Sequence, residues 1–86
     1  MIHHLKILPR FFEDIVSNHK RFEIRYDDRM YRVGDVLVLH EMRNEAMTGR
    51  KIHVQVQYIH RNDESNAYLE GGYCVLGFTV SAVAKG

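Results

Sequence analysis

Hydrophobic and polar residues alternate near the start of the chain, which predicts a first strand over residues 3–8. In this strand Leu5 and Ile7 fall on one face, and His4 and Lys6 fall on the other. Alternation of this kind is typical of a strand that packs one face on a core and leaves the other open to water.

The period then changes to that of a helix. Pro9 suits the first turn of a helix, where its missing N–H costs nothing. Phe12, Ile15 and Val16 recur at helical spacing and form a stripe that we expect to face the core. Asn18 follows the stripe and is expected to end the helix, because Asn tolerates the left-handed backbone conformation better than most residues.

A second strand is predicted over residues 20–26, and it carries a distinctive polar array. Alternation puts Phe22 and Ile24 on one face of this strand. The opposite face then carries Arg21, Glu23 and Arg25. Because Glu23 and Arg25 lie about 7 Å apart along a strand, one ligand can touch both. Lys20 has the opposite parity and must reach the same place from the start of the strand. The alternative is a solvated strand face with an ion pair worth about 0–1 kcal/mol.

The rest of the chain is dominated by strand patterns. Residues 36–39 form a continuous apolar run, as in a strand covered on both faces. A longer strand follows, in which the inward side chains are Ile52, Val54, Val56 and Tyr58. Gly71 and Gly72 introduce a last strand over residues 73–80. The connections are predicted as a short extended segment at 29–33, a loop at 42–49 with a turn at its end, a polar loop at 61–66 and a fraying tail at 81–86.

These patterns predict an α+β, mainly β fold: a small, partly open barrel of five or six strands with one early helix. The 86 residues suffice for one domain, spanning residues 1–86. A formal net charge of +1 supplies no global attraction for nucleic acid, so any such binding must come from a local patch. The single cysteine, Cys74, lies in an apolar run and is expected to be a small buried side chain in a reducing, cytoplasmic setting. The sequence predicts no membrane span.

Three residues of the second strand match a known signature, and the residue at its first position lies in the turn before the strand. Asn18, Lys20, Glu23 and Arg25 stand at the positions of GxKxxExR, so the chain resembles the ASCH branch of the PUA-like fold. Asn18 departs from the glycine of that pattern. Over residues 4–80 the chain more closely resembles a small uncharacterised bacterial and phage family within this branch, the domain of unknown function 3850. Further features shared with that family are Asp28, Arg29, Val33, Gly34, Asp35, Glu41, Thr48, Gly49, Arg50 and the segment 72–76.

The resemblance implies a cationic cleft beside the helix and the signature strand, which binds RNA or a nucleotide-like ligand. The side chains expected to line it are His4, Lys6, Lys20, Glu23, Arg25, Arg29, Thr48 and Arg50. The single carboxylate can orient a guanidinium or accept a hydrogen bond from the amine of a base. Tyr26 or Tyr31 would supply stacking, and Asp35 would brace Arg29 or Arg25.

Two other functions remain open. Some ASCH relatives are amidohydrolases of acylated cytidine, in which a lysine and a hydroxyl residue resemble a catalytic pair. Here Glu23 stands at the hydroxyl position, so a hydrolase would have to use Lys20 for an oxyanion and Glu23 as a base for water. The third possibility is a phage or bacterial accessory domain that binds another protein.

The histidines do not predict a metal site. His3 and His4 point to opposite faces of a strand, and His53 and His60 differ in parity, so no pair has ligand spacing. We therefore expect neither a metal nor a cofactor.

Overall fold

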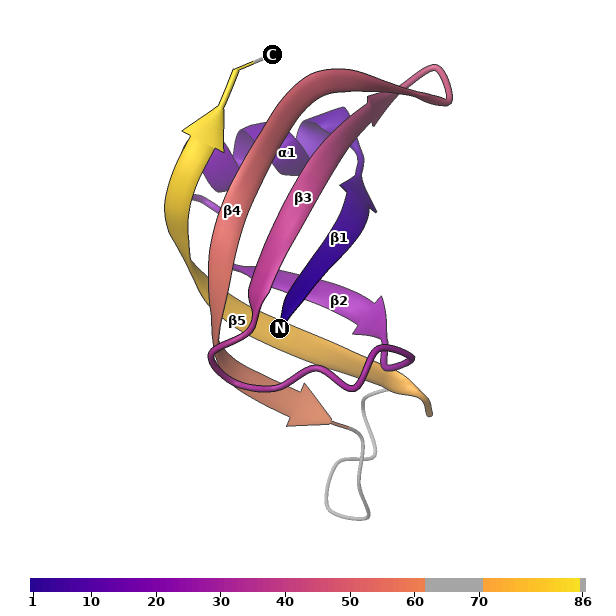
Figure 1. Ribbon diagram of the computed structural model, residues 1–86, viewed down its shortest axis with the longest axis vertical. Coiled ribbons are helices and arrows are strands. Elements are labelled where there is room, and N and C mark those ends of the chain that lie inside the picture. The colour runs from indigo at the N-terminus through magenta and orange to yellow at the C-terminus, as the bar shows by residue number, and fades with distance from the viewer. Residues whose placement is uncertain (62–70, 86) are drawn as a thin grey trace.

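The computed structural model describes residues 1–61 and 71–85. Within these residues, one helix and five strands follow each other (Figure 1). They are β1 (Ile2–Ile7), α1 (Pro9–Val16), β2 (Phe22–Tyr26), β3 (Val36–Arg43), β4 (Ala46–Arg61) and β5 (Tyr73–Ala84).

The five strands form one mixed sheet in the order β1-β3-β4-β5-β2. β1 and β3 are parallel, and the other neighbouring strands are antiparallel. The sheet curls, so that β2 and the first part of β5 cross below the other strands, while α1 lies behind them (Figure 1). The predicted fold class, mainly β and partly open, is confirmed. β1 and β2 are the two ends of the strand order, so the barrel is open between them.

The long strand β4 holds the two halves of the sheet together. Residues in its first part pair with β3, and residues from Lys51 to Arg61 pair with β5. The core fills the concave side and contains mostly aliphatic side chains from every strand except β2, together with two from α1. Its fully buried members include Leu37, Leu39, Ile52, Val54, Val56 and Leu76.

The helix α1 contacts the core through Phe12 and Ile15, which are each 1% exposed. Val16 is exposed, so its predicted place in the core stripe is wrong. The reason is angular: Val16 is one position beyond Ile15 and so lies about 100° around the helix. Asn18 has a φ of 68°, which confirms that it takes the left-handed conformation after the helix.

Two predicted connections differ from the structure. Residues 29–33 form no strand, and Met30 in their midst has a positive φ. The predicted loop over 42–49 is instead a tight hairpin, because β3 continues to Arg43 and β4 begins at Ala46. The turn residues Asn44 and Glu45 both have positive φ, 51° and 66°, as the two-residue turns of type I′ require.

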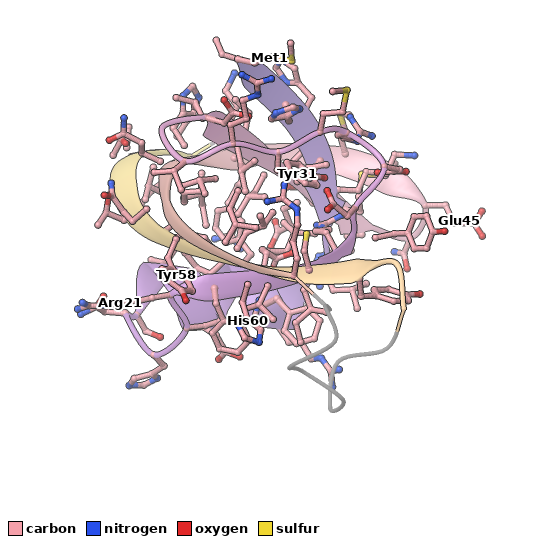
Figure 2. The ribbon with its side chains drawn as sticks, turned by 90° about the horizontal axis from the view of Figure 1, so that it is seen from below. Met1, Arg21, Tyr31, Glu45, Tyr58 and His60 are labelled. Carbon is pink, nitrogen blue, oxygen red and sulfur yellow. The ribbon has the colours of Figure 1, made fainter. Side chains whose placement is uncertain are left out.

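β4 and β5 also differ from the prediction, which placed Tyr58 inward and expected the chain to fray from residue 81. The register shifts between Val56 and Tyr58, so Ile59 packs against the core while Tyr58 is 66% exposed. Figure 2 shows Tyr58 toward the outside of the molecule and Tyr31 near its centre. β5 runs to Ala84, which pairs with Lys51, so the expected fraying from residue 81 is wrong up to that point. The predicted loop over 61–66 lies outside the described residues, apart from Arg61 at the end of β4.

Candidate functional site

A pocket of about 470 Å³ lies at the open side of the barrel, between the end of β1, the start of α1 and the whole of β2. Four charged side chains line it: Lys6, Lys20, Glu23 and Arg25. Its apolar lining consists of Ile7, Leu8, Phe11, Phe22, Ile24 and Tyr26. The pocket thus combines three cations and one carboxylate with aromatic and aliphatic walls.

Glu23 is the centre of the charged group. Its side chain is only 6% exposed, and each carboxylate oxygen has a cationic partner. The Lys20 ammonium donates to Oε1, and Arg25 Nε donates to Oε2 at 2.9 Å. The three signature side chains therefore converge on one place, and the ion pairs offset much of the cost of burying the carboxylate.

Lys20 is positioned by more than its carboxylate partner. Its ammonium also donates to the Phe22 carbonyl at 2.7 Å. The same nitrogen lies 4.9 Å from the centre of the Phe11 ring and 5.0 Å from that of Phe22. Two aromatic faces at this distance attract a cation, so Lys20 is held at the mouth of the pocket between α1 and β2.

Arginine side chains join the open edges of the barrel. Arg25 Nη2 donates to the carbonyl of Lys6 at 2.5 Å, across the gap between β2 and β1. Arg29 Nη1 donates to the carbonyl of His4, two residues earlier on the same edge of β1, at 3.3 Å. Side chains thus bind carbonyls that a neighbouring strand would bind in a closed barrel.

The polar side chains of β2 face inward more than its apolar ones do. Glu23 is buried and Arg25 is partly buried, whereas Phe22 and Ile24 are 42% and 55% exposed. Alternation separates the two sets of side chains correctly, but it does not say which set faces inward. The physical reason is that Glu23 brings its own counter-charges inward, while the apolar set lines the pocket and its rim.

Tyr26 lies at one end of the pocket, as the stacking prediction requires. Its ring packs on Gly72, where an added Cβ would lie 2.6 Å from Cε2 of the ring, and it meets Tyr73 edge-on at 5.4 Å. Tyr31 is different, because it is 2% exposed in the core and cannot stack on a ligand. Burial raises the pKa of the Tyr31 hydroxyl.

Two of the expected site residues belong to a separate group around the buried Glu41. Thr48 Oγ1 donates to Glu41 Oε1 at 2.7 Å, and Arg50 donates to both carboxylate oxygens, at 2.9 and 2.6 Å. Arg50 also donates to Glu13 of α1 at 2.7 Å and lies over the ring of Phe12. This group fastens the helix to β3 and β4, and neither Thr48 nor Arg50 lines the pocket.

His4 is also outside the pocket lining, although its backbone is close to it. Its Nδ1 lies 2.9 Å from Nε2 of His40 on β3, a pairing that the spacing in sequence did not reveal. Burial lowers the pKa of His40, and the neighbouring His4, Lys51 and His53 lower it further. The expectation that the protein uses no metal stays a prediction.

Asp35 does not brace the arginines of the site. It accepts hydrogen bonds from His3 Nε2 at 2.8 Å, from the backbone N–H of Arg32 at 3.0 Å and from the Met1 amine at 3.1 Å. Burial tends to raise the pKa of this carboxyl, but these donors outweigh it and lower the pKa to about 2. Cys74 is fully buried, as predicted, and burial raises the pKa of its thiol.

The lowered pKa values of Glu41 and Asp35 predict how the free energy of unfolding depends on pH. The hydrogen bonds from Arg50 lower the pKa of Glu41 to about 2, from an ordinary value of 4.5. A carboxyl whose pKa is lower in the folded state binds protons more readily when unfolded, so its stabilising effect is complete above the unfolded pKa and is lost as the pH falls. We expect the contribution of these two carboxyls to the free energy of unfolding to be constant above about pH 5.5 and to decrease from there to pH 2.

Urea unfolding at a series of pH values tests this expectation. Glu41→Gln should lower stability at pH 7 by about 1.5–3 kcal/mol, because it removes hydrogen bonds to a charge, and should make the acid limb shallower. Glu45→Gln in the exposed hairpin turn is the matched control and should keep the original profile. An unchanged acid limb in Glu41→Gln would show that the Glu41 carboxyl does not contribute to it.

Comparison with known proteins places the chain in a family. Residues 2–78 match the family described as a domain of unknown function, DUF3850. The chain belongs to this family. It is also similar to a protein of Escherichia phage P2 described as an uncharacterized 12.9 kDa protein in the GpA 3′ region, with 38% identity over 55 residues. That match covers 64% of the chain and 50% of the phage protein, so the chain spans about half the length of this relative.

The DUF3850 match covers every element that lines the pocket, from β1 to β2, and reaches into β5. It thus includes Lys6 and the three converging signature residues. Within the described residues, no helix is long and apolar enough to cross a membrane.

Proposed function

We propose that this DUF3850 domain is a cytoplasmic RNA- or nucleotide-binding module of the ASCH, PUA-like type, and that the pocket between β1, α1 and β2 is its binding site. The observation that carries the proposal is the convergence of Lys20, Glu23 and Arg25 with Lys6 in one pocket at the open edge of the barrel. The match of the first three to the ASCH signature supports the same assignment.

The composition of the pocket favours a nucleotide over a small inorganic anion. Three cations against one carboxylate leave a local excess of positive charge, in a protein whose net charge is only +1. Lys6 is exposed, and its ammonium has no ion-pair partner among residues 1–61 and 71–85. Its charge is therefore available for a phosphate. The rings of Phe11, Phe22 and Tyr26 add the flat apolar surface on which a base packs.

The hydrolase alternative receives less support. Glu23 would have to accept a proton from water, but both of its oxygens already accept hydrogen bonds from Lys20 and Arg25. Hydrolysis of an acylated cytidine that stops in Lys20→Ala would overturn the ranking of the two functions.

Titration with short single-stranded RNA across a salt series tests the proposal. We expect the logarithm of the affinity to fall with the logarithm of salt concentration, at a slope of about −0.7 for each phosphate contact. Lys6→Ala should weaken binding and reduce the slope by about 0.7, without leaving a buried group unpaired. Arg43→Ala, at the exposed far end of β3, removes an equal charge and should leave the affinity and the salt slope unchanged. Absent or salt-independent binding would contradict the proposal and favour a protein partner.

A further inference from the structure

The free edge of β2 forms part of the pocket. β2 is an end strand and, among residues 1–61 and 71–85, pairs only with β5. The Phe78 N–H donates to the Arg21 carbonyl at 3.0 Å, and the Asp27 N–H donates to the Gly72 carbonyl at 2.7 Å. Because backbone groups alternate in direction along an antiparallel strand, the odd-numbered residues of β2 bond to β5. The backbone groups of Phe22, Ile24 and Tyr26 therefore face away from β5, toward the pocket.

Two carbonyls on this edge are already used. The Phe22 carbonyl accepts a hydrogen bond from Lys20 Nζ at 2.7 Å, and the Tyr26 carbonyl accepts one from the Asp28 N–H at 2.9 Å. For the N–H and C=O of Ile24, no hydrogen bond is found within the described part of the chain. The middle residue of the strand thus presents one donor and one acceptor, side by side, to a pocket that its own side chain lines.

An adjacent donor and acceptor is the pattern on the Watson–Crick edge of every nucleobase. Adenine and cytosine offer an amine beside a ring nitrogen, and guanine and uracil offer a ring N–H beside a carbonyl. Proteins that recognise single-stranded RNA bind unpaired bases on these edges and on their faces. The Ile24 amide would contact the edge of such a base, and the neighbouring Phe22 and Tyr26 rings offer apolar surface for its faces.

We propose that the pocket binds a single unpaired nucleobase edge-on to the backbone of Ile24, with the phosphate of that nucleotide on Lys6 and Arg25. This inference rests on the proposed RNA-binding function and narrows its ligand to unpaired nucleotides. Because each of the four bases carries such an edge, the backbone contact by itself accepts any of them. A base within a duplex is excluded, since its edge is already paired.

A peptide strand added to β2 is the competing occupant of this edge. Strand addition uses a row of open backbone groups over several residues. Here Lys20 and Asp28 occupy the carbonyls of Phe22 and Tyr26, so among the outward-facing residues of β2 only Ile24 keeps both its donor and its acceptor open. The short opening and the cations beside it favour a nucleotide.

Binding of methylated RNA tests the inference. The four homotetramers of RNA are first ranked by calorimetry at fixed salt, and the tightest binder is then compared with its analogue methylated on the Watson–Crick edge, such as 3-methyluridine or N6,N6-dimethyladenosine. Methylation keeps the phosphates and the ring but blocks the edge. We expect at least a tenfold loss of affinity on methylation, and a similar loss for the tetramer sequence in a duplex.

A backbone variant gives a second measurement. Ile24→Pro removes the N–H at an edge position, where proline is tolerated, and Ile24→Ala keeps the N–H and removes most of the side chain. Once circular dichroism shows that both fold, Ile24→Pro should lose at least tenfold in affinity relative to Ile24→Ala. If Ile24→Pro does not fold, the methylated RNA still decides.

The outcomes separate the two proposals. If no tetramer binds, the proposed function itself fails. If the methylated or duplex RNA binds as tightly as the unpaired one, RNA binding stands but the edge-on contact is refuted. An extended valine–threonine hexapeptide that shifts the Ile24 amide resonance, while the tetramers leave it unmoved, would overturn the inference in favour of strand addition.

Discussion

Replacement of Glu23 by alanine is expected to lower the free energy of unfolding by about 3–5 kcal/mol, because it leaves two partly buried cationic groups without their counter-charge. Lys20 and Arg25 are only 15% and 23% exposed, so neither can regain full hydration without moving. Urea denaturation at pH 7 measures the loss.

Asp28→Ala is the matched control for this experiment. Asp28 is a carboxylate on the surface, 60% exposed and 4.0 Å from Arg29, so its removal should change stability by less than about 1 kcal/mol. A similarly small loss in Glu23→Ala would mean that the carboxylate is hydrated and that the three charges are not held together in solution.

The second large effect is expected for Phe12→Ala, at about 3–5 kcal/mol. Phe12 is 1% exposed, is one of two α1 side chains buried in the core, and supports the Arg50 guanidinium 4.3 Å above its ring. A domain of 86 residues is typically stable by about 4–13 kcal/mol, so this variant would have little stability left. Thermal denaturation followed by circular dichroism gives the comparison.

Phe11→Ala distinguishes the two roles of α1, which packs on the core and also lines the pocket. Phe11 is only partly buried and lines the pocket beside Lys20, so its loss should cost much less stability than that of Phe12 and should act mainly on ligand affinity. Equal destabilisation by the two substitutions would show that α1 is held by its whole apolar surface and not mainly by Phe12 and Ile15.

Much of the fold prediction rests on local periodicity in the sequence. The strand at Leu5 and Ile7, the helix from Pro9 and the apolar strand at 36–39 each follow from spacing within a few residues, and the structure has all three. The positive φ of Asn18 also follows from the residue type and its place after the helix. Features that depend on neighbouring residues in the sequence could therefore be predicted.

Features that depend on residues distant in the sequence could not be predicted. The burial of Glu23 depends on counter-charges and on the position of β2 at the end of the sheet, and alternation alone cannot say which face points inward. Tyr58 was misplaced because the register shift before it reverses the parity of the strand, and no residue marks that shift.

Prediction of the candidate site from the sequence was limited in the same way. Lys6, Lys20, Glu23 and Arg25 meet in one pocket, whereas Thr48 and Arg50 bind Glu41 instead. A cationic or hydroxyl residue in the sequence does not reveal whether its partner is a ligand or a buried carboxylate from another strand. The lining by Leu8 and Phe11 was missed because it depends on how the helix lies against β2.

The bond from Arg25 to the Lys6 carbonyl has a consequence for the size of ligand that the barrel can admit. In a closed barrel, widening the wall means breaking a ladder of amide bonds. Here the spacing between β1 and β2 depends at this point on the torsion angles of one arginine, and side-chain rotations are fast compared with strand separation. The opening can therefore adjust to ligands of different size while every strand stays hydrogen-bonded to its neighbours.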